Sequence, residues 1–180
     1  MNTEPHRDGP PRSVLIVALV IAVVAAGAVL AIAATRTPAP TPVPIAAAPA
    51  PAAAGPDCAR LLAELPDTLG DYRRAVAAEP VPPGTAAWQA EPGGEPVILR
   101  CGLDRPLDFV IGAPLQLVDA VQWFRVTDPS GTITTWFAVD RPVYVALTLP
   151  TGSGPTPIQE ISRAIEKTLP AVALQPGPPR

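Results

Sequence analysis

The side chains that could support catalysis are few, and their positions exclude several kinds of site. The one histidine, His6, precedes the first apolar segment, so the rest of the chain has no imidazole to act as a general base. A Ser–His or Cys–His nucleophile is therefore excluded there. Two cysteines without histidines are too few ligands for zinc. Gly152-Ser153-Gly154 precedes a helix but lacks the lysine of a phosphate-binding loop. We predict no metal and no cofactor.

Paired carboxylates are the remaining enzymatic option. Asp67 with Asp71, or Asp104 with Asp108, could be the acid and base of a cell-wall hydrolase. Prolines or turns lie beside these residues, and capping or turn hydrogen bonds explain them more simply. A Ser–Lys dyad would need Lys167, which we place on the exposed face of a helix. We expect a protein that is not an enzyme, with a carboxylate hydrolase as the alternative.

Cys58 and Cys101 are the only cysteines, and both follow the apolar segment. Cys58 shares a helical face with Leu61 and Leu65, and Cys101 shares a strand face with Leu99. This placement suits a disulfide between a helix and a sheet in an oxidising compartment. Two separate buried thiols are the alternative. The spacing is not that of a redox-active CxxC pair.

Aromatic and cationic side chains alternate with aliphatic ones along the expected strands. If the aliphatic residues face inward, one outer face collects the following residues: Arg100, Trp123, Arg125, Thr134, Trp136, Tyr144 and Thr148. Rings with arginines between them could stack on sugars or hold an anionic polymer. Ordinary cross-strand pairing on a solvated sheet, or cover from a loop at 81–94 carrying Trp88, is the simpler explanation. Trp123 would instead face the core if a bulge shifted the register.

The elements that must position these residues begin with an uncharged apolar run at 13–35. As a helix it reaches about 34 Å, enough for a hydrocarbon core of roughly 30 Å. We predict a retained signal anchor in the lipid bilayer. A signal peptide cleaved near Ala31-Ile32-Ala33 is the alternative. Arg7 and Arg12 precede the run, which favours a short cytoplasmic tail at 1–12 and a folded domain outside the cell membrane.

Residues 36–56 are rich in proline and alanine and have no periodic apolar face. We predict a semi-rigid spacer that reaches about 60 Å when extended. Residues 171–180 form a second proline-rich segment, which we expect to be a disordered tail.

Residues 57–170 carry the patterns of one α+β domain. We predict helices at 58–65 and 156–169, the first capped by Asp57 and the second by a capping box at Thr156. Alternation predicts strands at 71–78, 96–101, 121–127, 132–139 and 143–149, and the last three form a meander. Residues 81–94 and most of 104–119 read as irregular. The expected architecture is an antiparallel sheet of four or five strands with two helices on one face.

Short motifs follow the spacer in a distinctive order: CARLLAELPDTL at 58–69, AAW at 86–88, ILRCG at 98–102, TTWF at 134–137 and RPVYVALTLP at 141–150. With the anchor and spacer, this order resembles an actinobacterial family of membrane-anchored exported proteins, the domain of unknown function 3515. The resemblance covers roughly 57–170 and implies a disulfide between Cys58 and Cys101. It implies location and architecture but no activity.

Charge narrows the choice of partner. The net charge of −3 and the absence of a basic run argue against nucleic acid. We expect a membrane-anchored, non-catalytic module that binds or organises a component of the cell envelope: a cell-wall glycan, a peptide or another envelope protein. A purely structural partner of another membrane protein is a further alternative.

Overall fold

The computed structural model describes residues 11–35, 41–91 and 93–179. Most of the predicted cytoplasmic tail at 1–12, including His6, lies outside these residues. The chain divides into two compact units, Met1–Ala39 and Pro40–Arg180, which are described separately.

In the described part of the first unit, residues 11–35 form the helix α1 (Arg12–Thr35), as the apolar run predicts. An 18-residue window within Arg12–Ala33 has a mean hydropathy of 3.1, and none of that window is buried among the described residues. A helix of this length that is apolar on every side fits either a membrane anchor or a signal peptide.

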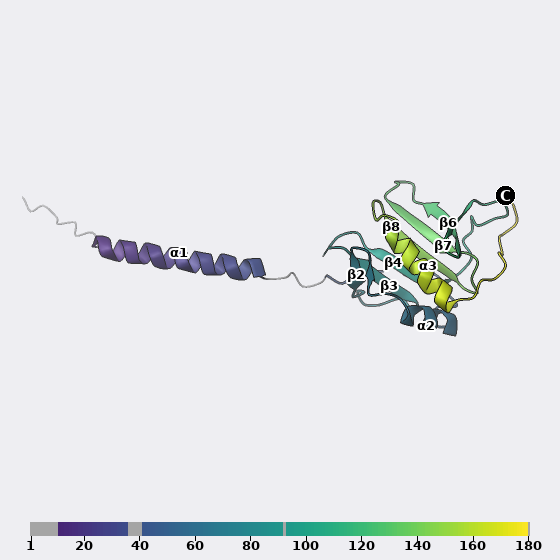
Figure 1. The fold of residues 1–180 in the computed structure, drawn as a ribbon, viewed down its shortest axis with the longest axis horizontal. Coiled ribbons are helices and arrows are strands. Elements are labelled where there is room, and N and C mark those ends of the chain that lie inside the picture. Colours follow the sequence, from purple (N-terminus) through teal and green to yellow (C-terminus); the bar gives the residue numbers. More distant parts are fainter. Residues whose placement is uncertain (1–10, 36–40, 92, 180) are drawn as a thin grey trace, which may run out of the picture. The chain divides into compact units, whose positions relative to one another are not determined.

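The second unit, called the domain below, is built on one antiparallel sheet of eight strands, whereas the sequence predicted four or five. The strands follow the order β1-β2-β3-β4-β8-β7-β6-β5, so two runs of adjacent hairpins meet where β4 pairs with β8 (Figure 1). Their bounds are β1 Thr68–Leu69, β2 Tyr72–Ala75, β3 Thr85–Gln89, β4 Val97–Leu103, β5 Leu115–Val118, β6 Val121–Thr127, β7 Ile133–Ala138 and β8 Tyr144–Pro150. The predicted strands correspond to β2, β4, β6, β7 and β8.

Strand β3 is the largest departure from the predicted elements, because residues 81–94 were expected to be a loop. The strand pairs with β2 on one side and β4 on the other. Trp88 lies fully buried within it and donates a hydrogen bond from Nε1 to the carbonyl of Pro66 at 2.9 Å. Ala86 and Ala87 have low strand propensity, but burial on both faces of the sheet outweighs that propensity.

Helices α2 (Pro56–Ala63) and α3 (Thr156–Thr168) cover one face of the sheet, as predicted (Figure 1). Leu61, Ile161 and Ile165 pack there against Leu99 and Leu147 in the main core.

The predicted caps of both helices are wrong. The N-cap residues are Gly55 and Pro155, neither makes a side-chain cap bond, and Asp57 and Thr156 already lie within the first turn. A proline at N1 or N2 favours the first turn of each helix, because its φ is fixed near the helical value.

The opposite face of the sheet, called the reverse face, is covered as well. Residues 41–55, called the strap, run across it. Val43 and Ile45 are buried against Ala87 and Ile98. The amide of Val43 donates to Val76 O at 2.8 Å, and the amide of Ala78 donates to Val43 O at 2.8 Å. Most of the predicted spacer at 36–56 therefore belongs to the domain, and its extended reach of about 60 Å does not apply.

The C-terminal segment also packs on the domain, so the expected disordered tail at 171–180 is wrong for the described part of that segment. Gly177 donates to Phe109 O at 2.8 Å and accepts from the amide of Ile111 at 2.9 Å. These bonds hold the 104–114 loop on the reverse face, where the Phe109 ring packs against Phe124 in a tilted arrangement with ring centroids 5.6 Å apart. The sheet is therefore apolar on both sides.

Candidate functional site

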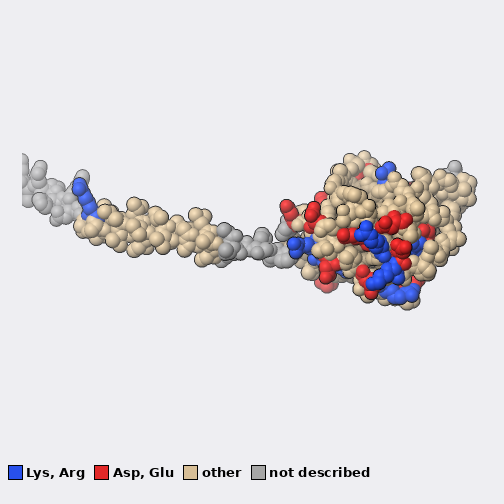
Figure 2. Space-filling model, in the orientation of Figure 1, with Lys and Arg blue, Asp and Glu red and all other residues tan. Residues whose placement is uncertain are grey.

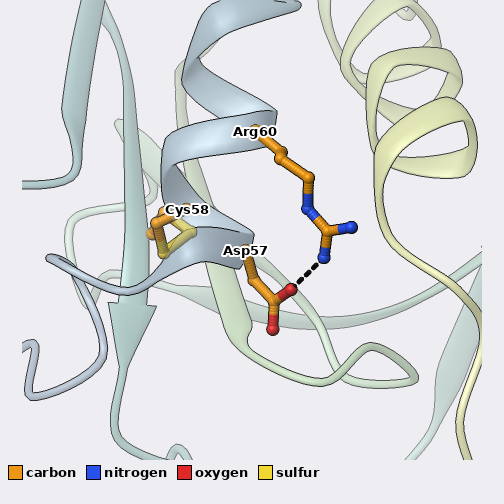
Figure 3. Close-up of a disulfide and its surroundings, with 4 residues drawn as sticks. Asp57, Cys58 and Arg60 are labelled. Atoms are coloured by element: carbon orange, nitrogen blue, oxygen red, sulfur yellow. Dashed lines mark hydrogen bonds and ion pairs between the residues drawn. A yellow bond between two sulfur atoms is a disulfide. The ribbon is translucent and has the colours of Figure 1, made fainter.

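The two cysteines are joined in the structure. Cys58 of α2 and Cys101 of β4 form a disulfide with a Cα–Cα distance of 5.6 Å, and both residues are fully buried (Figure 3). Asp57 and Arg60 form an ion pair on the neighbouring surface of α2. The bond links a helix to the middle of the sheet, as their positions on apolar faces predict.

The predicted ligand face does not exist as one surface, because its residues lie on two sides of the sheet. Trp136 stands opposite Arg125 on β6 and opposite Leu147 on β8. Leu147 belongs to the core under the helices, so Trp136, Arg125 and Thr134 lie on the helix side. Phe137 packs with the reverse-face cluster. The inward and outward residues of β7 are thus the opposite of those predicted.

The remaining members of that set are elsewhere. Arg100 and Thr148 line a pocket on the reverse face. The Tyr144 hydroxyl donates to Gln175 O at 3.4 Å, and burial raises the pKa of this phenol. Trp123 is fully buried, donates from Nε1 to Ser162 Oγ at 3.0 Å, and belongs to the main core. It is a core residue with its polar atom satisfied, so it cannot contact a ligand from the surface.

Arg125, Thr134 and Trp136 do come together, in an open groove on the helix side of about 730 Å³. Strands β5 to β8, the 151–155 loop and the start of α3 line this helix-side groove. The Arg125 guanidinium lies over the Trp136 ring, with Cζ 5.7 Å from the centroid. A half-buried aromatic ring beside a cation, with Thr127 and Gln159 nearby, offers stacking, charge and hydrogen bonds in one place.

Charged side chains near α2 and α3 are of mixed sign rather than gathered into a patch of one sign (Figure 2). Lys167 pairs with Glu64, and Arg163 lies 3.8 Å from Asp119. Lys167 is thus an ion-pair partner on the surface of α3. This surface does not offer the stripe of positive charge that phosphate chains require.

The carboxylate pairs lie in turns. Asp67 and Asp71 flank the short strand β1, and the carbonyl of Asp67 accepts from the amide of Arg74 at 2.7 Å. Asp104 follows β4 and lines the reverse-face pocket, and Asp108 lies in a turn four residues later. No cluster of three or more His, Cys, Asp or Glu side chains in the described part of the chain could hold a metal ion.

The chain matches a family described as a protein of unknown function, DUF3515, over residues 17–174. It belongs to that family. The match includes most of α1, the whole strap and the beginning of the C-terminal segment, so the family pattern is wider than the 57–170 region that the motifs cover. No curated protein and no solved structure matches the chain.

The DUF3515 domain also contains a buried ion pair that sequence reasoning missed. Asp140 and Arg141 are each about 5% exposed or less, and Asp140 Oδ2 lies 3.1 Å from Arg141 Nη1. Arg141 Nη2 donates to Ala120 O at 2.7 Å, and the Gln122 amide donates to Asp140 Oδ2 at 3.1 Å. The pair links the turn before β6 to the turn before β8. In the sequence, residues 140–142 (DRP) indicate a turn but do not indicate that the pair is buried.

Proposed function

We propose that this DUF3515 protein is a membrane-anchored, non-catalytic module that binds a cell-envelope glycan in its helix-side groove. The observation that carries the proposal is the Arg125–Trp136 pair, held in a groove of about 730 Å³. A sugar ring presents a flat apolar face to an aromatic ring and hydroxyls to hydrogen-bonding groups, and the groove offers both.

The titratable side chains among the described lining residues of the groove support a binding role over hydrolysis. Asp119 is the single carboxylate among its described lining residues, and it faces Arg163. Glycoside hydrolysis ordinarily needs two carboxylates on opposite sides of the scissile bond. Among its described lining residues the groove offers the Trp136 ring and hydrogen-bonding groups rather than a pair of carboxylates, and this supports the proposed binding role.

We infer that α1 is retained as an anchor and that the domain lies outside the cytoplasm. The disulfide supports this compartment, because cytosolic thiols are usually kept reduced. Alkylating intact native membranes before reduction, followed by mass spectrometry, should find Cys58 and Cys101 joined. Finding both residues alkylated would contradict the inferred compartment.

The binding proposal is tested by sedimenting the detergent-solubilised full chain with purified cell-wall sacculi. Trp136→Ala should weaken retention by about tenfold, because it removes most of one aromatic contact. Arg125→Ala should weaken retention less and make it insensitive to salt.

Arg73→Ala is the matched control, since Arg73 is also exposed on a strand but lies outside the groove. All variants are compared only after thermal unfolding shows that they are folded. Equal retention of the Trp136→Ala and Arg73→Ala variants would refute glycan binding at this groove. Release of soluble sugar by the unaltered chain would refute the non-catalytic role.

A further inference from the structure

The reverse face contains a second pocket, called the reverse pocket, of about 590 Å³. Phe137 of β7, Ala146 of β8 and Leu103 of β4 contribute to it, together with the strap at Ala46–Pro49 and the loop around Leu107. This size falls within the range of about 300–1,000 Å³ that is typical of small-molecule sites. The strap makes the pocket concave where a bare sheet would be flat.

Two arginines line this otherwise largely apolar pocket. Arg100 is half-buried, and its Nη2 donates weakly to Ala46 O at 3.4 Å. Arg105 donates from Nη1 to Phe109 O at 3.1 Å. Within the described residues neither has a carboxylate at ion-pair distance. Burial lowers the pKa of Arg100, because its charged guanidinium is partly desolvated in the pocket wall.

We propose that the reverse pocket binds a single-chain anionic amphiphile, a fatty acid in its simplest form, with its head group at Arg100 and Arg105 and its hydrocarbon chain against Phe137, Ala146 and the strap. An anion here would compensate the half-buried guanidinium of Arg100 with charge-assisted hydrogen bonds. This site is separate from the helix-side groove and does not depend on glycan binding there.

The other lining groups favour a hydrocarbon chain over a sugar or a free anion. Thr135 and Thr148 place their hydroxyl oxygens 3.2 Å apart, so these groups already hydrogen-bond each other. The strap presents alanines and a proline, and Leu107 is 78% exposed at the rim. Asp104 also lines the pocket, and its negative charge favours a head group with one negative charge over one with two.

The test uses the full chain in nanodiscs of zwitterionic lipid, with a fatty acid that carries a diazirine in its chain. After irradiation, mass spectrometry locates the label. Labelling within Arg12–Thr35 reports insertion of the probe into the bilayer and serves as the internal reference for every variant. Peptides containing 46–49, 103–107 and 137–146 report the reverse pocket.

Two variants perturb the pocket without altering the core. Arg100→Gln removes the charge and should reduce pocket labelling by about tenfold relative to the helix. Ala47→Phe places a bulky side chain in the pocket from the exposed strap, and it should reduce pocket labelling at least as much as Arg100→Gln does. Ala54→Phe is the matched control, because Ala54 is also exposed on the strap but does not line the pocket. An alkyl amine with the same diazirine chain tests the sign of the head group and should label the pocket much less than the acid.

Acid-selective labelling that is lost in both pocket variants and retained in Ala54→Phe supports the proposal. Labelling of the helix alone would overturn it. Equal labelling by acid and amine, or no effect of Arg100→Gln, would overturn the anionic head group. Labelling by a diazirine phospholipid but not by the fatty acid would overturn the single-chain assignment. A failure of sacculus retention in the earlier experiment would leave these results unaffected.

Discussion

Replacing Gly102 with alanine should detach the strap from the sheet. Gly102 lies at a register shift in β4 and has φ of +84°, a region that favours glycine. A Cβ built on Gly102 would lie 2.3 Å from the backbone nitrogen of Ala53 and 2.5 Å from the carbonyl carbon of Ala52. These are backbone atoms, so no side-chain rotation can relieve the contact. The strap would have to move.

The expected magnitude has two parts. A non-glycine residue in the left-handed region costs about 1–2 kcal/mol. Forcing extra volume into a packed contact costs about 1–3 kcal/mol more. Gly102→Ala should therefore lower the free energy of unfolding by about 2–5 kcal/mol. With a urea m-value of about 2 kcal/mol/M, the unfolding midpoint falls by about 1–2.5 M.

Gly112→Ala separates the two parts of this cost. Gly112 has a similar φ of +86°, but a Cβ there would meet nothing within 4 Å. It should therefore incur the conformational cost alone. Urea unfolding of both full-length variants can be followed by tryptophan fluorescence, because all three tryptophans lie in the domain. Equal loss of stability in the two variants would refute the steric reasoning. Unchanged hydrogen exchange at the Ala52 amide, which bonds Gly102 O at 3.1 Å, would do the same.

Further predictions concern the disulfide, a buried hydrogen bond and a surface carboxyl. Replacing Cys58 and Cys101 together by alanine should lower the unfolding free energy by about 4 kcal/mol in urea titrations, because the bond joins residues 43 apart; a loss below about 1 kcal/mol would contradict this. Ser162→Ala leaves Trp123 Nε1 without its acceptor and should cost about 1–3 kcal/mol by the same assay, so an unchanged midpoint would count against the bond. Hydrogen bonds, the strongest from the Ser130 hydroxyl, lower the pKa of Asp128 below its ordinary value of 3.8. The ionised carboxylate should therefore stabilise the fold fully above pH 3.8, and this stabilisation should be lost as the pH falls through the lowered pKa. Carboxyl carbon NMR measures this pKa directly, and a value of 3.8 or higher would be inconsistent with the turn geometry.

The elements that sequence patterns predicted well are those with one clear apolar face. The stripe of Ile158, Ile161 and Ile165 predicts α3, and alternating Val145, Leu147 and Leu149 predict both β8 and its inward face. In these segments local periodicity and burial point to the same structure, so spacing alone is informative.

The errors in assigning strand residues to faces, and in treating 41–55 as a spacer, share one physical cause, which is that the reverse face of the sheet is also covered. The prediction assumed that aliphatic residues of β7 would all face one core, but Phe137 packs under the 104–114 loop while Trp136 faces the helices. Alternation cannot assign faces when both are apolar. The candidate ligand face is divided for the same reason: Arg125, Thr134 and Trp136 lie together in the helix-side groove, whereas Arg100 and Thr148 line the pocket on the reverse face.

The sequence of the strap contains one indication that it packs on the domain, although its proline-rich composition suggests a solvated spacer. Val43 and Ile45 are the only large apolar residues in 36–56, and they are spaced by two as in an extended segment. Proline-rich composition predicts an extended backbone correctly, but it does not decide whether that backbone is solvated. The packing of the strap on the sheet depends on Gly84 and Gly102, whose missing side chains leave room for Ala53. These residues lie far from the strap in the sequence, so local patterns do not predict the contact.

The strap and the disulfide together determine how the domain would respond to mechanical load. Tension applied from the N-terminal side would first separate Val43 and Ile45 from the sheet, because they are the first buried residues in the described part of the domain, which begins at residue 41. Unravelling could then proceed only to Cys58, where the covalent link passes the force to Cys101 in β4. Since β4 lies between the β1–β3 strands and the β8–β5 strands, the load reaches the centre of the sheet rather than an edge. Under load the strap would therefore extend first, and the disulfide would limit how far the chain can extend.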